Sequence, residues 1–135
     1  KSGLDKHVTV FMGMLDDNNG TLQYSVAGHH PLPIVFQHGK SDAIPLARSS
    51  FPIGLFDGAT YFNETLAVTE DFALVLFSDG ILEVVKKGDY ASKEAYLRQV
   101  VQDTRGRFEE IKAVLSPPKT MQVPDDIAIM SVTRI

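Results

Sequence analysis

The chain has 135 residues, a length that suits one domain, and its hydrophobic fraction of 44% and charged fraction of 22% are ordinary for a folded protein. Its net charge of −4 argues against a broad contact with a nucleic-acid backbone, and the absence of cysteine excludes disulfides, thiolate catalysis and zinc–thiolate sites. The longest unbroken apolar run, Phe72–Phe77, is far shorter than the roughly 20 residues that span a bilayer. We therefore expect a cytoplasmic protein that binds neither nucleic acid nor membrane.

The first part of the chain carries the alternating or apolar runs that are typical of β-strands. The turn at 16–20, Asp-Asp-Asn-Asn-Gly, joins two such runs and predicts a β-hairpin, in which Asp16 and Asp17 are turn residues. A tight break follows at 27–31. The predicted strands are 7–15, 21–26, 34–37, 42–46, 61–68 and 73–77.

After Gly80 the apolar spacing changes to three and four residues, which indicates helices. We predict a short helical turn at 81–85, a helix capped by Ser92 that runs to Gln102, and a helix over 108–115 that ends at two prolines. A last strand is predicted at 127–132. The expected fold class is α+β, with mainly antiparallel strands and helices packed on one face.

Two acidic turns stand where predicted strands end or begin. Asp79 follows the apolar strand 73–77, and the pair Asp125 and Asp126 precedes the last strand. Carboxylates held at strand ends are suitable ligands for hard divalent cations, so both turns could meet at one metal site. The alternatives are that Asp79 is an ordinary turn residue before Gly80 and that the acidic pair protects a sheet edge.

The adjacent histidines His29 and His30 invite a zinc site or a general base. Neighbouring side chains point in different directions, and no third ligand lies at helical spacing, so we favour a structural turn built on Gly28.

Five phrases together carry a family resemblance. They are Val-Thr-Val-Phe-Met-Gly-Met-Leu-Asp, Tyr-Ser-Val-Ala-Gly-His-His-Pro, Phe-Pro-Ile-Gly-Leu, Leu-Phe-Ser-Asp-Gly-Ile-Leu-Glu and Pro-Asp-Asp-Ile-Ala. In this order they resemble the carboxy-terminal part of a bacterial protein phosphatase 2C-like domain of the SpoIIE/RsbU type, and the chain is also similar to the output domain of RssB-type response regulators. Because the chain starts at Lys1 and enters a strand almost at once, we expect residues 1–135 to be that portion of a longer protein.

The resemblance implies an αββα sandwich and two Mn²⁺ or Mg²⁺ ions that activate a water against a phosphoserine or phosphothreonine. By the family's motifs, Asp79 and Asp125 match metal ligands, Asp126 matches their weaker neighbour, and Gly28, His29 and Gly80 belong to structural motifs. Two upstream family segments, of the types Gly-Asp-x-x-Asp and Asp-x-x-Gly-His-Gly, do not occur here, and Ala128 stands where the family usually has threonine. The ligand set is therefore incomplete.

The implied function is a metal-dependent serine/threonine phosphatase that serves as the output of a bacterial signalling protein or response regulator. Its partner would be a phosphoprotein regulator, such as an anti-sigma antagonist. The alternative is a catalytically inactive adaptor that binds a sigma factor or antagonist. A third possibility is a homodimer formed through an open sheet edge.

Overall fold

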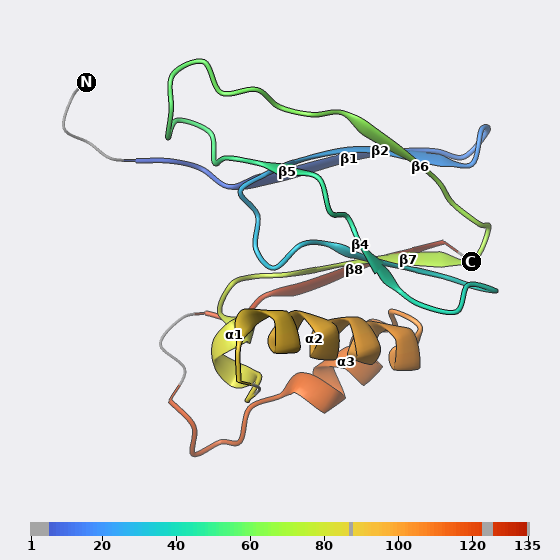
Figure 1. Cartoon of the computed structure of the whole chain (residues 1–135). Coiled ribbons are helices and arrows are strands. Elements are labelled where there is room, and N and C mark those ends of the chain that lie inside the picture. Colours follow the sequence, from blue (N-terminus) through green and yellow to red (C-terminus); the bar gives the residue numbers. More distant parts are fainter. Residues whose placement is uncertain (1–5, 87, 123–125, 135) are drawn as a thin grey trace. The chain divides into compact units, whose positions relative to one another are not determined.

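A computed structural model describes residues 6–86, 88–122 and 126–134. By its internal contacts the chain divides into two compact units, one formed by residues 6–29 and 47–68 and the other by residues 30–46 and 69–134. Each unit contains one sheet, and all the helices lie in the second unit (Figure 1). Within the described ranges, no helix combines the length and the apolar character that crossing a membrane requires.

The first unit is a four-stranded sheet built around the expected hairpin. Strands β1 (Val10–Asp16) and β2 (Thr21–Ala27) pair antiparallel from Asp16–Thr21 to Val10–Ala27. The Asp16 carboxylate accepts hydrogen bonds from the backbone N–H groups of Asn18 and Asn19, at 2.9 and 3.1 Å, and so closes the turn. The hairpin prediction is confirmed, but Asp16 is the last residue of β1, paired with Thr21, and contributes to the turn through its side chain.

The other side of β2 is shared by two short strands. Strand β6 (Glu64–Ala67) pairs antiparallel with residues 21–24, and β5 (Ser49–Ser50) pairs parallel with Val26 and Ala27. The predicted strand 61–68 is therefore too long, because β5 occupies the edge of β2 that residues 61–63 would need. The sequence analysis did not predict β5, whose residues carry no alternating apolar pattern.

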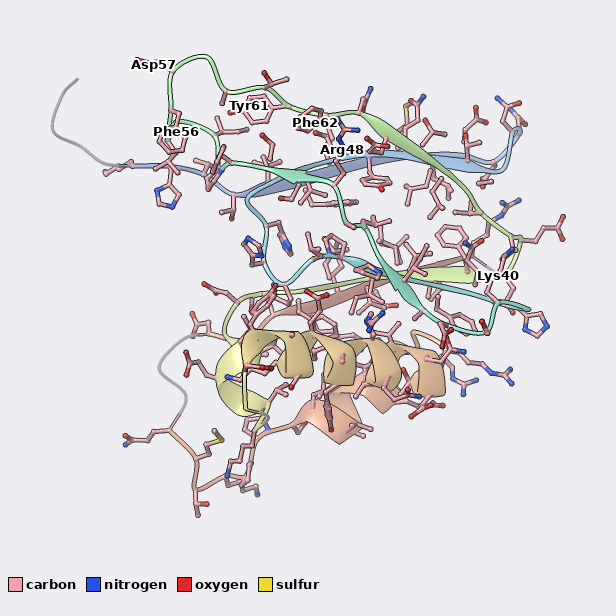
Figure 2. All side chains as sticks on the ribbon, viewed as in Figure 1. Lys40, Arg48, Phe56, Asp57, Tyr61 and Phe62 are labelled. Atoms are coloured by element: carbon pink, nitrogen blue, oxygen red, sulfur yellow. The ribbon has the colours of Figure 1, made fainter. Side chains whose placement is uncertain are left out.

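Arg48 fixes the chain between β5 and β6. Its guanidinium carbon lies 4.0 Å from the centre of the Phe62 ring, and its Nη1 lies 3.1 Å from Oε1 of Glu64 (Figure 2). A cation over an aromatic face is attracted by the ring quadrupole. These contacts hold Phe62, which lies just before β6, although it is not paired with a neighbouring strand.

The second unit is a four-stranded antiparallel sheet in the order β4-β3-β7-β8, with three helices on one side of it (Figure 1). Its elements, in chain order, are β3 (Ile34–Gln37), β4 (Ile44–Pro45), β7 (Phe72–Phe77), α1 (Ile81–Val84), α2 (Tyr90–Thr104), α3 (Phe108–Leu115) and β8 (Ile129–Arg134). The expected α+β fold with antiparallel sheets and helices is confirmed.

The core of this unit lies between the sheet and the helices. Alternate residues of β7, namely Ala73, Val75 and Phe77, pack with buried apolar residues of α1, α2 and α3, such as Ile81, Leu97 and Ile111. All six residues of β7 are buried, as its unbroken apolar run predicts.

Several limits differ from the predictions: β1 spans Val10–Asp16 instead of 7–15, β4 spans only Ile44–Pro45 of the predicted 42–46, and α2 and β8 are also shifted. Helix α2 begins at Tyr90 and runs to Thr104, because Asp89 is its N-cap: the Asp89 carboxylate accepts from the backbone N–H of Ser92 at 2.8 Å. Ser92 is the third residue inside the helix and not its cap. Strand β8 begins at Ile129 instead of residue 127.

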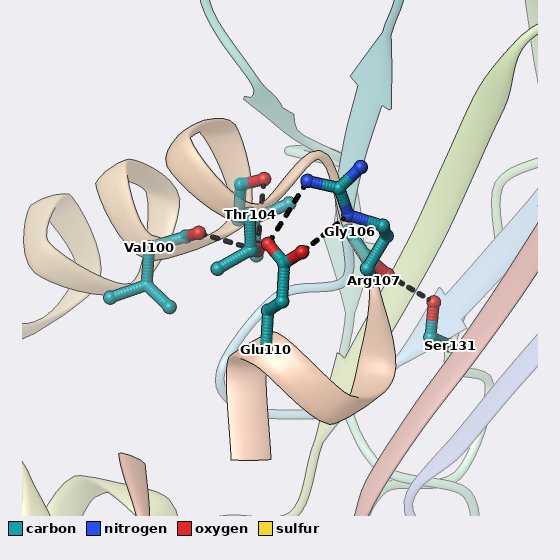
Figure 3. A network of polar contacts seen from close by, with 7 residues as sticks. Val100, Thr104, Gly106, Arg107, Glu110 and Ser131 are labelled. Atoms are coloured by element: carbon teal, nitrogen blue, oxygen red, sulfur yellow. Dashed lines mark hydrogen bonds and ion pairs between the residues drawn. The ribbon is translucent and has the colours of Figure 1, made fainter. Parts of the chain in front are cut away.

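The turn between α2 and α3 is fastened to the sheet by a polar network (Figure 3). The Ser131 hydroxyl of β8 donates to the Gly106 carbonyl at 2.6 Å, and the Thr104 hydroxyl donates to the Val100 carbonyl at 2.7 Å. Arg107 and Glu110 form a two-pronged ion pair, with Nε–Oε1 and Nη2–Oε2 distances of 2.8 and 3.1 Å. Of these contacts, the Ser131 bond joins the α2–α3 turn to β8, and the others stabilise the end of α2 and the start of α3.

Candidate functional site

The Ser-Asp-Gly turn connects β7 directly to α1. Ser78 is half-buried, Asp79 is exposed and Gly80 is buried. The backbone N–H of Ile81 donates to the Ser78 carbonyl at 3.1 Å, and that of Leu82 donates to the Asp79 carbonyl at 3.0 Å. Because these bonds tie the turn to the first residues of α1, the backbone of Asp79 is held between a buried strand and a helix.

Ser78 joins this turn to the segment that precedes β8. Its backbone N–H donates to the Ala128 carbonyl at 2.9 Å, and the Ala128 N–H donates to the Ser78 hydroxyl oxygen at 2.7 Å. The Ser78 hydroxyl in turn donates to the Asp126 carbonyl at 3.2 Å. A serine hydroxyl can donate and accept at the same time, and here it does both across two distant stretches of chain.

The register of the sheet explains this meeting. The last antiparallel pair of β7 and β8 is Phe77 with Ile129, so the next residues, Ser78 and Ala128, are brought opposite each other. The turn that carries Asp79 therefore lies beside the segment that carries Asp126, which is exposed. Asp125, the other predicted ligand of this segment, lies outside the described residues.

The donors of this site suit a hard divalent cation in kind, because carboxylates are the oxygen ligands that Mg²⁺ and Mn²⁺ prefer. They do not suffice in number. Over the ranges 6–86, 88–122 and 126–134, no three histidine, aspartate or glutamate side chains gather where they could hold a metal ion. A complete metal site would need ligands beyond Asp79 and Asp126.

Gly28 shapes the turn that carries the two histidines. Gly28 has a φ of +69°, and a Cβ at this position would overlap the Cγ of Pro52, so only glycine fits. The Nδ1 atom of His30 lies 3.3 Å from the Tyr90 hydroxyl, and the two rings meet edge to face at 6.2 Å. The part of the chain that can be described shows no metal cluster at either His29 or His30.

Sequence reasoning missed the residues that build the site's frame. The sequence marks Ser78 only as part of a motif and gives no sign of its contacts with Asp126 and Ala128. The signal for Ser78 was a polar residue placed directly after a fully buried strand, but its partners depend on which strand pairs with β7.

One family model matches the whole chain. The profile of Stage II sporulation protein E (SpoIIE) matches residues 1–135. Protein IcfG of Synechocystis sp. is 28% identical over 97 residues, which is 71% of this chain and 14% of that protein.

Several solved structures share the fold of this chain. The RsbU and RsbW domains of a Mycobacterium tuberculosis protein match with a TM-score of 0.75 at 18% identity, over 98% of this chain and 38% of that one. RsbX in complex with magnesium matches with a TM-score of 0.68 at 14% identity, over 94% and 56%. The manganese-presoaked SpoIIE phosphatase domain of Bacillus subtilis matches with a TM-score of 0.66 at 12% identity, over 93% and 56%. At these identities the likeness shows the fold, and the chain spans between about a third and three fifths of these structures.

Proposed function

This chain belongs to the SpoIIE family, and from that membership we propose that it is part of a metal-dependent phosphatase that dephosphorylates a serine or threonine of a regulatory protein. The observation that carries the proposal is the Ser78 contact with Asp126 and Ala128, which brings the Ser-Asp-Gly turn beside the terminal acidic segment. The fold likeness to the SpoIIE phosphatase domain and to magnesium-bound RsbX supports it.

In this proposal Asp79 and Asp125 are metal ligands and Asp126 is a weaker one, together with ligands from elsewhere in the protein. Mn²⁺ or Mg²⁺, when bound, supplies a water of lowered pKa and a counter-charge for the phosphoryl oxygens. Asp79 is suited to its role because its backbone is fixed at both sides while its side chain is exposed. No cysteine is available as a nucleophile, which is consistent with attack by water.

The setting in a bacterial signalling pathway, with a phosphoprotein or anti-sigma antagonist as partner, is part of the same proposal. It is supported by the resemblance of the fold to RsbU and RsbX. Attachment to a response-regulator receiver domain, a cytoplasmic location and homodimerisation through a sheet edge stay predictions.

The test uses full-length protein and compares Asp79→Asn with Glu83→Gln. Both substitutions remove one negative charge from an exposed side chain, but Glu83 lies on α1, and no metal-binding cluster in the described residues includes it. We expect wild type and Glu83→Gln to hydrolyse p-nitrophenyl phosphate and a phosphoserine peptide in the presence of Mn²⁺, and Asp79→Asn to lose this activity. Absence of Mn²⁺-dependent hydrolysis by the wild type would remove the phosphatase proposal.

The second candidate function is that of a catalytically inactive adaptor that binds a sigma factor or its antagonist. It is favoured by the shortage of converging carboxylates in the described residues, since a protein-binding module needs none. In that case a sigma factor or its antagonist would be captured in the absence of metal, and Asp79→Asn would capture it equally well. Loss of capture on this substitution would contradict the adaptor function.

A further inference from the structure

Ser78 occupies the point where the paired strands β7 and β8 separate. We propose that Ser78 is a positioning residue for the metal site, which holds the Asp126 segment at a fixed distance from the Asp79 turn. The inference rests on the proposed function.

The regular pairing of β7 with β8 ends one residue before Ser78. Phe77 and Ile129 form the last strand pair, and beyond them a single backbone bond, from Ser78 N–H to the Ala128 carbonyl, continues the pairing. The Ser78 hydroxyl adds one bond to Ala128 N–H and one to the Asp126 carbonyl. Beyond the last strand pair, three hydrogen bonds made by Ser78 therefore connect the end of β7 to the segment that carries Asp126 and Ala128.

Different contacts hold the Asp79 turn and the segment that carries Asp126. The Asp79 side is held by α1, through the bond from Leu82 N–H to the Asp79 carbonyl at 3.0 Å. On the other side, Asp126 and Ala128 are exposed, and the three hydrogen bonds that tie them to the end of β7 come from Ser78. Metal ligands must be held within about 0.5 Å of their working positions, so loss of the Ser78 hydroxyl, which removes two of these three bonds, loosens the segment that carries Asp126.

Ser131 provides a matched control on the same pair of strands. Its hydroxyl donates to the Gly106 carbonyl at 2.6 Å, so it also ties β8 to a backbone carbonyl of the same unit. Ser131→Ala removes a bond of the same type, but at the α2–α3 turn and away from Asp79. A purely structural role for Ser78 predicts that both alanine variants behave alike.

The experiment measures Mn²⁺ binding by calorimetry on full-length wild type, Ser78→Ala, Ser131→Ala and Ser78→Thr. We expect Ser78→Ala to weaken Mn²⁺ binding about tenfold, which corresponds to the loss of one or two hydrogen bonds that orient a ligand. Ser131→Ala should bind Mn²⁺ like the wild type, and Ser78→Thr, which keeps the hydroxyl, should recover most of the affinity. Hydrogen exchange of the Ala128 amide, measured without metal, should accelerate in Ser78→Ala alone.

The outcomes separate this inference from the proposed function. If the wild type binds Mn²⁺ and Ser78→Ala binds it equally well, the positioning role is wrong and the phosphatase proposal is untouched. The positioning role is also wrong if Ser131→Ala weakens Mn²⁺ binding as much as Ser78→Ala. If the wild type binds no Mn²⁺ and has no Mn²⁺-dependent activity, the proposed function fails, and the role of Ser78 fails with it.

Discussion

Gly106 closes the turn between α2 and α3, and its replacement by alanine tests how tightly this turn packs on the sheet. The residue has a φ of +70°, its N–H donates to the Val101 carbonyl at 3.0 Å, and its carbonyl accepts from the Ser131 hydroxyl. A Cβ at this position would overlap the Cβ of Ala73 on β7. Ala73 is buried in the strand, so it cannot move aside as the end of a flexible side chain would.

Two terms contribute to the cost of Gly106→Ala. A left-handed φ costs an alanine about 1–2 kcal/mol, and overpacking a closed core costs typically about 1–3 kcal/mol more. The matched control is Gly39→Ala in the β3–β4 turn, where φ is +81° and no atom lies within 4 Å of the added Cβ. The control shares the backbone strain and the effect on the unfolded chain, so the difference between the two variants isolates the overlap with Ala73.

The assay is urea unfolding followed by circular dichroism, with the free energy of unfolding taken from the linear extrapolation. We expect Gly106→Ala to unfold at a lower urea concentration than Gly39→Ala, with a difference of about 1–3 kcal/mol. Equal stability of the two variants would refute the close packing of the α2–α3 turn on β7. It would also remove the basis for treating Ser131 as a fixed structural anchor.

Three further substitutions test individual contacts. Hydrogen bonds from the Ser92 side chain and backbone N–H lower the pKa of Asp89 below its ordinary 3.8. The Asp89 carboxylate therefore stabilises the fold above pH 3.8, and this contribution is lost as the pH falls through the lower folded-state pKa. The difference in urea midpoint between wild type and Asp89→Ala should shrink over that range. Leu97→Ala, at a position 0% exposed, should cost about 2–5 kcal/mol in the same unfolding assay. Gln37→Met should cost about 0.5–1.5 kcal/mol, because the Thr69 N–H, which is half-buried and now donates to Gln37 Oε1 at 2.9 Å, loses its acceptor.

Local rules predicted those parts of the molecule in which neighbouring residues decide the conformation. The unbroken apolar run of β7 indicated a buried strand, the 16–20 turn indicated a hairpin, and the spacing of Ile111 and Leu115 indicated an amphipathic helix. In each case the hydrophobic period or the turn chemistry is complete within a short stretch of chain, so no distant partner is needed to read it.

The sequence predicted the two acidic turns of the candidate site, but not the contact that joins them. Asp79 and Asp126 could be recognised as acidic residues at strand ends, and the family motifs suggested that they meet. The serine that joins the halves was not recognised, because its role depends on the register of β7 against β8.

The sequence by itself determined the class of the fold, the place of the buried strand and the presence of acidic turns, since composition and periodicity act over a few residues. The tertiary structure alone decided the rest. Pairing of β5 with β2 shortened β6. Pairing of β7 with β8 set Ser78 against Ala128, because backbone hydrogen bonds select their partners by register across the whole sheet, which no short stretch of sequence contains.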